Sequence, residues 1–298
     1  METKKTRGTG RTERFGTNWK NTPGGMGAKG MSRKLIFLDI DGTLTMGGGN
    51  QPAESDLSAI RTARERGHLV FLCTGRNYVM LAPLLRFGFD GYIGSAGGYI
   101  VCGGQVIYDC PMRLEQVRTV LALLHRNGVY CTLGTRDASF GDERLGSGDN
   151  GIIRWRQALF QRMSIRPMAE YRGEPVYQIG FMCAEAGQLE EARAALGKDF
   201  VFVAYHNPAR SFLSGDLINR AFDKGRGVRR VCEYYGADPA DTIGFGDSMN
   251  DLEMLQTVGT GVAMRHADPE LRKRCQRICA AAEDGGLGRT LLELIGGE

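Results

Sequence analysis

The sequence predicts an α/β protein with a doubly wound, mostly parallel, Rossmann-like core sheet and an inserted α+β domain. Short apolar runs such as Leu35–Leu38 alternate with helical patterns and end at polar turns. This alternation stops near Pro111 and resumes with a helix that begins at Lys224. The expected regions are a disordered basic tail over 1–32, a first core segment over 33–110, the inserted domain over 111–206 and a second core segment over 207–298.

The basic tail holds most of the positive charge of the chain. The formal net charge is +4, whereas residues 1–34 alone carry +7, so the rest of the chain is slightly acidic. This distribution excludes a nucleic-acid face on the folded body and leaves only the tail as a basic arm. The tail is also rich in Gly and Thr and poor in large apolar residues, which is typical of disorder. We therefore expect no nucleic-acid partner.

Cysteine usage and hydropathy indicate the compartment. The sequence shows neither the apolar core of a signal peptide nor a run long enough to span a bilayer. Its eight cysteines are scattered, mostly within apolar runs, and none forms a C-x-x-C pair. This pattern indicates reduced, buried thiols and no zinc cluster. We expect a soluble, cytoplasmic protein without a membrane partner, and the pattern indicates no particular oligomeric state.

Turn residues mark the elements of the first core segment. Pro52 begins a helix with two acidic residues in its first turn, where carboxylates suit the helix dipole, and Gly67 ends it. Gly103-Gly104 is a two-residue loop that suits a β-hairpin. The expected elements are strands over 35–38, 68–73 and 90–94, helices over 52–67 and 77–87, and hairpin strands over 99–102 and 105–108.

The inserted domain mixes helix and strand patterns, and the alternating pattern follows it. Val117, Val120 and Leu124 form one helix face, which Gly128 ends. In the insertion we expect helices over 114–127, 152–160 and 186–196, strands over 129–133, 177–183 and 200–205, and a polar loop over 134–150. In the second core segment we expect helices over 224–235 and 252–256, from 269 and around 287–295, with strands over 242–246, 260–264 and 277–280.

Two carboxylates follow the first apolar strand directly. Asp39 and Asp41 are two residues apart, so they start on the same side of the strand. At the carboxyl end of a buried parallel strand they lie where open α/β sheets bind ligands. Two such groups repel each other unless a cation lies between them, one carboxyl keeps its proton, or both face water.

Three further strand or helix ends carry polar residues. Taken singly, Thr74 could be a helix cap, Lys224 a surface lysine, and Asp247 with Asp251 a cap and a first-turn charge. Taken together they supply what phosphoryl transfer requires. Asp39 can be the nucleophile and Asp41 the general acid and base. Thr74 and Lys224 can bind phosphoryl oxygens, and the remaining carboxylates can bind Mg²⁺.

These residues form four ordered motifs that resemble those of the haloacid dehalogenase superfamily. The motifs are Asp39-x-Asp41-Gly42-Thr43, Thr74-Gly75-Arg76, Lys224-Gly225 and Gly246-Asp247-Ser248-x-Asn250-Asp251. The insertion between the second and third motifs is similar to the α/β cap of Cof-type phosphatases. The resemblance implies Mg²⁺ as the cofactor, with Asp39, Asp247, Asp251 and the backbone carbonyl of Asp41 as its ligands. It implies Asp39, Asp41, Thr74 and Lys224 as catalytic residues and Asp41, Gly42, Thr74, Gly75, Lys224 and Asn250 as phosphate-binding residues.

Two stretches depart from the pattern of that family. Ala96-Gly97-Gly98 stands where relatives often have Asn-Gly-Ala, and Arg265-His266 interrupts a stretch that usually has small or neutral residues. The second departure could contact an anionic or sugar-bearing substrate, or it could be a solvated turn. Candidates for substrate contact within the cap are Arg136, Asp137, Arg154, Trp155, Arg156 and His206.

The expected function is that of a Mg²⁺-dependent phosphatase acting on a small phosphorylated metabolite, a sugar phosphate or a cofactor phosphate, through a phospho-aspartate on Asp39. One alternative is a phosphomutase, which uses the same aspartyl-phosphate chemistry. Another is a binding protein that keeps the fold without catalysis. A binding protein predicts a broken set of catalytic residues, whereas the set here is complete.

Overall fold

The computed structural model describes residues 33–143, 164–205, 211–280 and 285–296, with isolated positions between 153 and 161. Its central strand is β1 (Leu35–Leu38), whose four side chains are all buried. This strand pairs in parallel with β2 (Leu69–Cys73) and with β12 (Thr242–Gly246). Strands therefore flank β1 at both of its edges, and its apolar run has no polar alternation, as in other parallel strands that are buried on both faces.

The core sheet has eight strands in the order β14-β13-β12-β1-β2-β3-β4-β5. It is parallel from β14 to β3, and the hairpin of β4 and β5 adds two antiparallel strands at one edge. This arrangement confirms the predicted α/β class with a mostly parallel core. The remaining strands are β3 (Gly91–Gly94), β4 (Tyr99–Cys102), β5 (Gln105–Asp109), β13 (Thr260–Met264) and β14 (Arg277–Cys279).

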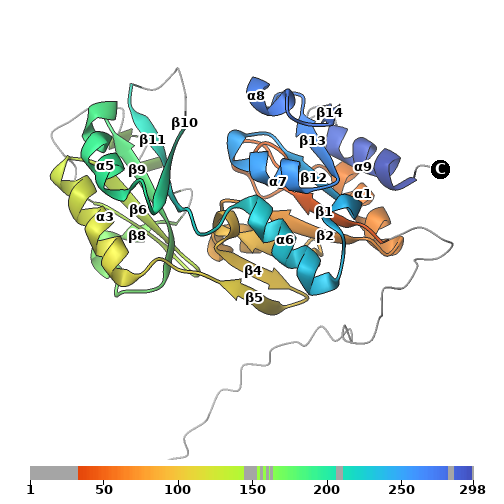
Figure 1. The fold of residues 1–298 in the computed structure, drawn as a ribbon, viewed down its shortest axis with the longest axis horizontal. Helices are drawn as coiled ribbons and strands as arrows, with labels where there is room; N and C mark the ends of the chain where they lie inside the picture. Colours follow the sequence, from red (N-terminus) through yellow and green to blue (C-terminus); the bar gives the residue numbers. More distant parts are fainter. Residues whose placement is uncertain are drawn as a thin grey trace, which may run out of the picture.

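Helices cover both faces of this sheet (Figure 1). On one face α1 (Glu54–Glu65) packs against α9 (Gly286–Gly296), and on the other α6 (Lys224–Tyr235) packs against α7 (Leu252–Thr257). The helix α6 begins at Lys224 because the Asp223 side chain caps it, accepting a hydrogen bond from the Arg226 N–H at 2.7 Å. The shorter helices are α2 (Tyr78–Leu85), α8 (Pro269–Arg272), η2 (Ser95–Gly97), η5 (Pro239–Asp241) and η6 (Met249–Asp251).

The cap is a separate six-stranded sheet in the order β10-β11-β9-β6-β7-β8. It is antiparallel except between β7 and β8. Two helices cover the face that points away from the core, and they bury a second hydrophobic cluster against it (Figure 1). The elements are α3 (Leu114–Arg126), β6 (Tyr130–Thr135), β7 (Ser139–Gly141), β8 (Arg166–Pro167), η3 (Met168–Glu170), β9 (Val176–Cys183), η4 (Ala186–Leu189), α5 (Glu190–Leu196), β10 (Phe200–Tyr205) and β11 (Leu213–Asn219).

The second boundary of the cap was predicted too early. The strand β11 lies between β10 and β9 in the cap sheet, so the core resumes after Asn219 and not at 207. Gly215 and Asp216 interrupt the apolar run of this strand, which hides it from a hydrophobicity pattern. The glycine has a packing reason, because a Cβ there would lie 2.1 Å from the Val203 carbonyl oxygen.

Smaller differences concern single elements. The polar loop expected over 134–150 contains β7, and the strand β8 was not expected. The helix expected over 152–160 falls mostly outside the described residues, as does the tail over 1–32. All eight cysteines are free thiols. Among the described helices, none has the length and apolar character needed to cross a membrane.

Candidate active site

The carboxyl ends of β1, β2 and β12 bring three predicted residues to one edge of the core sheet. Asp39 follows β1, Thr74 follows β2 and Asp247 follows β12. Asp39 is buried, and its backbone N–H continues the parallel ladder by donating to the Phe245 carbonyl at 3.0 Å. This bond to β12 fixes the main chain of Asp39 at the end of β1 and leaves its carboxylate at the edge of the sheet.

Lys224 joins this edge from the start of α6. Its side chain is 1% exposed, and its Nζ donates to Asp39 Oδ1 at 2.6 Å and to Asp251 Oδ1 at 2.5 Å. Asn250 Oδ1 accepts a longer bond from it at 3.4 Å. Burial disfavours the charged ammonium, but the two carboxylates outweigh burial and hold the pKa of Lys224 above its ordinary value. The interpretation as a surface lysine is therefore excluded.

Backbone and hydroxyl donors hold the two carboxylates of the last motif. Asp251 is fully buried, and its Oδ2 accepts from the N–H groups of Asp247 and Ser248, both at 3.1 Å. Thr43 Oγ1 donates to Asp247 Oδ1 at 3.2 Å. A carboxylate that receives such bonds keeps one orientation, so the loops after β1 and β12 are fixed relative to each other.

Gly42 was predicted to bind phosphate, but its backbone N–H has another partner. Its N–H donates to the Thr45 carbonyl at 2.8 Å, so this N–H is not directed to a phosphate. The residue has a φ of +92°, and a Cβ there would lie 2.2 Å from Asp247 Oδ2. The missing side chain of Gly42 is thus what lets the Asp247 carboxylate approach the first motif.

The three carboxylates suit a divalent cation. Oxygens of Asp39, Asp247 and Asp251 all lie within 4.8 Å of one another. Together with the Lys224 ammonium they leave two negative charges uncompensated when ionised. Burial and the neighbouring Asp251 carboxylate raise the pKa of Asp39 well above its ordinary value, and they raise the pKa of Asp247 to about 6. Oxygen donors under such charge repulsion fit a hard ion such as Mg²⁺.

Asp41 does not share the burial of Asp39. Its carboxylate is about half exposed, and Arg76 binds it with two bonds, Nη2 to Oδ1 at 2.7 Å and Nε to Oδ2 at 2.8 Å. The arginine is itself nearly buried and donates further to Asn50 Oδ1 and to the Gly49 carbonyl. Arg76 belongs to the Thr74-Gly75-Arg76 motif, but no role in the site was predicted for it. Its position in the sequence, as a charged residue in the turn after an apolar strand, could have indicated a role in the site.

Thr74 and Gly75 form one wall of the same site. Thr74 is buried, and its N–H donates to the Ile93 carbonyl at 2.8 Å. Its Oγ1 accepts a bond from the Arg76 N–H at 3.0 Å, so the hydroxyl proton can be donated to a ligand. A Cβ at Gly75 would meet nothing within 4 Å, so this turn is open toward its surroundings.

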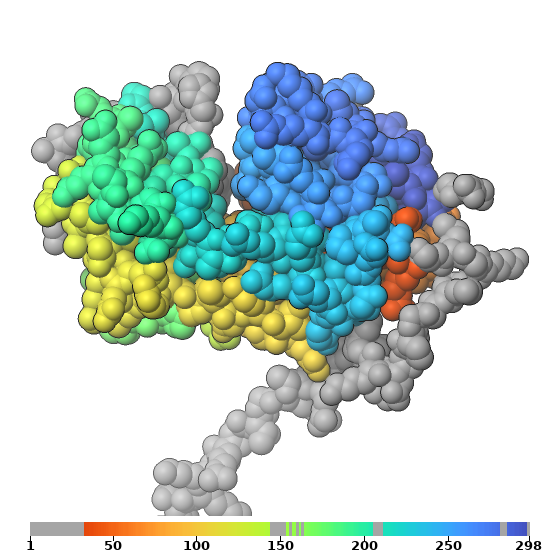
Figure 2. Space-filling model, in the orientation of Figure 1, coloured from red at the N-terminus to blue at the C-terminus, as the bar shows by residue number. Residues whose placement is uncertain are grey.

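Several of these residues line a cavity of about 480 Å³ between the core and the cap. Figure 2 shows the notch where the green cap meets the blue part of the core. The core contributes Asp39, Asp41, Thr74, Gly75, Arg76 and Asn250, and the inner face of the cap sheet contributes Thr132, Gln178, Gly180, Met182, Ser214 and Asp216. The volume is in the usual range of sites for small molecules.

The second departure from the family pattern lies beside Gly42 of the first motif. His266 is exposed, and its Nε2 is 2.7 Å from the Gly42 carbonyl oxygen. Neither it nor Arg265 is among the described residues that line the cavity, so a contact with substrate is not supported. The cap candidates Arg136, Asp137 and Arg154 are exposed and are likewise absent from the described lining. Trp155, Arg156 and His206 lie outside the described residues.

Comparison with protein families shows to which family the chain belongs. A family model described as haloacid dehalogenase-like hydrolase matches residues 36–291. The chain belongs to this family. The haloacid dehalogenase-like relatives include the Bacillus subtilis (strain 168) protein named "Putative phosphatase YkrA", which is 30% identical over 89% of this chain and 98% of its own length. Another is the pyridoxal phosphate phosphatase YbhA of Escherichia coli (strain K12), 24% identical over 83% of this chain and 93% of its own length.

Solved structures of haloacid dehalogenase-like proteins share the whole fold. A hypothetical protein from Geobacillus kaustophilus HTA426 has a TM-score of 0.75 and 29% identity, and the match covers 88% of this chain and 99% of that one. The subclass IIB sugar phosphatase BT4131 has a TM-score of 0.73 and 23% identity, with the same coverage. These findings confirm the predicted superfamily, the Cof-type group with its cap, and the assignment as an enzyme of the phosphatase class.

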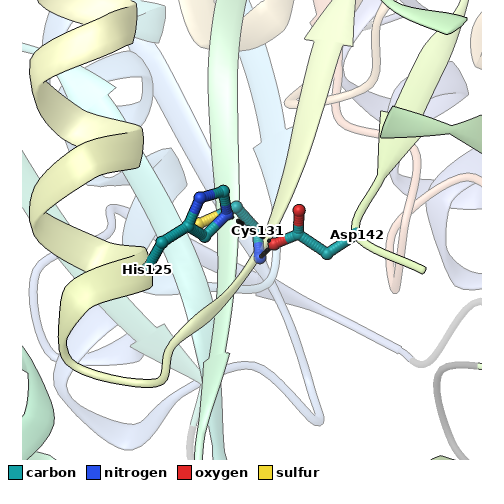
Figure 3. Close-up of side chains that lie close together, drawn as sticks. All are labelled: His125, Cys131 and Asp142. Atoms are coloured by element: carbon teal, nitrogen blue, oxygen red, sulfur yellow. Dashed lines mark hydrogen bonds and ion pairs between the residues drawn. The ribbon is translucent and has the colours of Figure 1, made fainter. Parts of the chain in front are cut away.

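A second cluster of ligating groups lies in the cap, on the side that carries α3. Figure 3 shows the His125 ring facing the Asp142 carboxylate beside Cys131. Asp142 Oδ2 lies 2.7 Å from His125 Nε2 and also accepts from the Cys131 N–H at 2.8 Å. Burial and the Asp142 charge raise the pKa of the Cys131 thiol well above its ordinary value. Because a metal binds the thiolate, we interpret this cluster as a structural link between α3, β6 and β7.

Proposed function

We propose that this chain is a Mg²⁺-dependent phosphatase that hydrolyses a small phosphorylated metabolite, a sugar phosphate or a cofactor phosphate, with Asp39 as nucleophile. The observation that carries the proposal is the contact of Lys224 with both Asp39 and Asp251 at one end of the cavity. A carboxylate nucleophile beside a buried cation, with carboxylates to spare for a metal, is what transfer through an aspartyl phosphate requires. The relative named as a pyridoxal phosphate phosphatase supports a metabolite of this size.

The cation would be held by Asp39, Asp247, Asp251 and the backbone carbonyl of Asp41. When bound, Mg²⁺ would neutralise charge on the phosphoryl oxygens and orient the group for in-line attack. Around the same oxygens, Lys224 would supply its ammonium, Thr74 its hydroxyl, Gly75 its N–H and Asn250 its amide N–H. These donors come from the turn after β2, the start of α6 and the short helix η6, all at one edge of the core sheet, so little reorganisation is needed when the substrate binds.

The reaction would proceed in two displacements. In the first, an oxygen of Asp39 attacks phosphorus, the bond from phosphorus to the ester oxygen breaks, and Asp41 gives its proton to the leaving alcohol. In the second, Asp41 takes a proton from water, the water oxygen attacks phosphorus, and the Asp39 carboxylate is regenerated as phosphate leaves. Because Arg76 holds Asp41 half exposed, Asp41 must turn from Arg76 toward the ester oxygen in the first displacement.

Phosphate release from a panel of phosphate monoesters tests this proposal. We expect Asp39→Asn to lower kcat by at least about a thousandfold, because an amide is a far poorer nucleophile than a carboxylate. Asp241→Asn is the matched control, since Asp241 is exposed and precedes β12 at the opposite end of that strand. EDTA should stop the reaction and Mg²⁺ should restore it. Activity in Asp39→Asn equal to that of the control would remove Asp39 from the mechanism, and an isomerised product without free phosphate would indicate a phosphomutase.

A further inference from the structure

The cap is joined to the core by two chain crossings, one between β5 and α3 and one between β11 and α6 (Figure 1). A domain held only by such crossings is expected to move relative to its neighbour, unless side chains bind the two together elsewhere. A further link between core and cap lies at the turn after β2. It is formed by Asn77, which follows Arg76 directly and is the residue before α2.

The Asn77 side chain bonds to both domains at once. On the core side its Oδ1 caps α2, where it accepts a hydrogen bond from the Met80 N–H at 3.2 Å. On the cap side its Nδ2 donates to the Thr135 carbonyl at 2.8 Å, and it lies 3.2 Å from the Ala138 carbonyl oxygen and 3.0 Å from Ser139 Oγ. Because a backbone N–H only donates and a carbonyl only accepts, these partners fix which end of the amide faces the cap.

The two turns that Asn77 connects are each held by their own hydrogen bonds. In the cap, the N–H and Oγ1 of Thr135 both donate to the Ala138 carbonyl, at 3.0 and 2.8 Å, which closes the turn between β6 and β7. In the core, the carbonyls of Thr74 and Arg76 accept N–H bonds from η2 at 2.9 and 2.8 Å. Asn77 is itself buried, so its amide joins two ordered turns away from solvent.

A backbone bond crosses the same boundary. The Val79 N–H donates to the Arg136 carbonyl at 3.1 Å. Val79 is the second residue of α2, and the N–H groups of a first helical turn have no acceptor within their own helix. The acceptor of the Val79 N–H lies on the cap, so the exchange of this proton with solvent reports whether the cap is docked.

The contact lies at the wall of the cavity. Asn77 and Ser139 both line it, next to the turn Thr74-Gly75-Arg76 that is proposed to bind phosphate. Arg76, the neighbour of Asn77 in the chain, holds the Asp41 carboxylate. Breaking the Asn77 contact would therefore change how the cap stands relative to the groups that act on the phosphate.

We propose that Asn77 is a positioning residue that keeps the cap docked on the phosphate-binding turn before substrate binds, so that the leaving group of an ester meets a cap already in place. The docking is independent of the proposed phosphatase function, and the consequence for the reaction rests on it. Ser, Thr and Asp also cap helices, but of these capping residues only asparagine adds an amide N–H that reaches beyond the helix it caps.

Hydrogen exchange of the Val79 N–H, measured by NMR on the full chain without substrate, tests the docking. Asn77→Asp keeps the shape and the acceptor for α2 but turns a carboxylate toward two carbonyl oxygens. We expect the Val79 N–H to exchange at least about tenfold faster, as the loss of two or more neutral hydrogen bonds implies. Asn77→Ser keeps a helix cap that is too short to reach the cap domain, so it should act in the same direction without the added repulsion.

Asn127→Asp is the matched control. Asn127 donates to the Leu123 carbonyl and to the Glu191 carboxylate, so its partners all lie within the cap. Its substitution should leave the exchange of the Val79 N–H as in wild type. Exchange at the wild-type rate in both Asn77 variants, or an equal acceleration in Asn127→Asp, would overturn the inference.

The effect on the reaction separates positioning of the cap from damage to the core turn. Two substrates are compared: the phosphate monoester that wild type hydrolyses with the highest kcat/KM, and acetyl phosphate, whose leaving group is only acetate. In both Asn77 variants we expect kcat/KM to fall about tenfold for the monoester and about twofold or less for acetyl phosphate. An equal loss for both substrates would place the effect in the core turn and overturn the positioning role. Failure of wild type to hydrolyse either substrate would instead contradict the phosphatase proposal, while the exchange experiment would still decide the docking.

Discussion

The core and the cap each hold three potential ligand groups within 4.8 Å of one another. In the core, Asp39, Asp247 and Asp251 surround one lysine and keep surplus negative charge beside a cavity. In the cap, Asp142 is bonded to His125 and to the Cys131 N–H, and burial with the Asp142 charge raises the pKa of the Cys131 thiol. The two clusters thus have similar spacing and differ in charge balance. The core cluster keeps surplus negative charge when its carboxylates are ionised, whereas the cap cluster has one carboxylate that is already bonded to its neighbours.

Replacing Lys224 with Met tests the charge balance of the core cluster and should have the largest effect. It removes the only cation in contact with the Asp39 and Asp251 carboxylates among the described residues. We expect kcat/KM to fall by about a thousandfold and the free energy of unfolding without Mg²⁺ to fall by about 3 kcal/mol, because an uncompensated buried charge remains. Urea denaturation with and without Mg²⁺ measures the second effect.

A matched control for this variant is Lys273→Met, which breaks the exposed ion pair with Glu270. Exposed pairs contribute little, so stability and activity should stay near those of wild type. If Lys224→Met and Lys273→Met behaved alike, the core cluster would be no more dependent on charge balance than the surface.

Gly42→Ala tests whether the core cluster depends on close approach of its loops. The new Cβ would collide with Asp247 Oδ2, and the φ of +92° would be strained by any side chain. We expect the affinity for Mg²⁺ to fall by about tenfold or more, together with about 1 kcal/mol of stability. The control is Gly47→Ala, since Gly47 also has a positive φ but a Cβ there would meet nothing within 4 Å. Isothermal titration with Mg²⁺ measures both, and equal affinities would contradict the role given to Gly42.

The same contrast shows what the sequence could and could not predict. The core cluster was predictable because parallel strands deliver their carboxyl ends to one edge, so Asp39 and Asp247 had to approach each other once both strands were recognised. The contact of Arg76 with Asp41 was not predictable, because side-chain pairing depends on the loop around Asn50. The strand β11 was not predicted because Gly215 interrupts its apolar pattern. A side chain at Gly215 would collide with the Val203 carbonyl of β10.

The pH dependence of Mg²⁺ binding gives a further test of the carboxylates in the core cluster. The pKa of Asp247 is raised to about 6 by burial and by Asp251, above its ordinary value of 3.8. The folded protein therefore holds the extra proton more tightly than the unfolded chain. Its metal-free stability loses this contribution as the pH rises from about 4 through about 6.

Because Mg²⁺ competes with that proton, it should raise the melting temperature more at about pH 7.5 than at about pH 5. Thermal unfolding in Mg²⁺ and in EDTA at both values measures the difference. In Asp247→Asn the dependence should be weaker, because one of the titrating groups is gone. A stabilisation by Mg²⁺ that is the same at both values would show that these carboxylates do not bind it.

The smallest effects are expected in the cap. His125→Ala removes one hydrogen bond to Asp142, which still accepts from the Cys131 N–H, so stability should fall by only about 1 kcal/mol. Phosphatase activity should be unchanged, since none of His125, Cys131 and Asp142 is among the described residues that line the cavity. Zn²⁺ should shift the melting temperature of wild type and His125→Ala alike, because Asp142 is already bonded to His125 and to the Cys131 N–H and because burial disfavours the thiolate that a metal would need. A shift by Zn²⁺ that disappears in His125→Ala would make the cap cluster a metal site and erase the distinction between the two clusters.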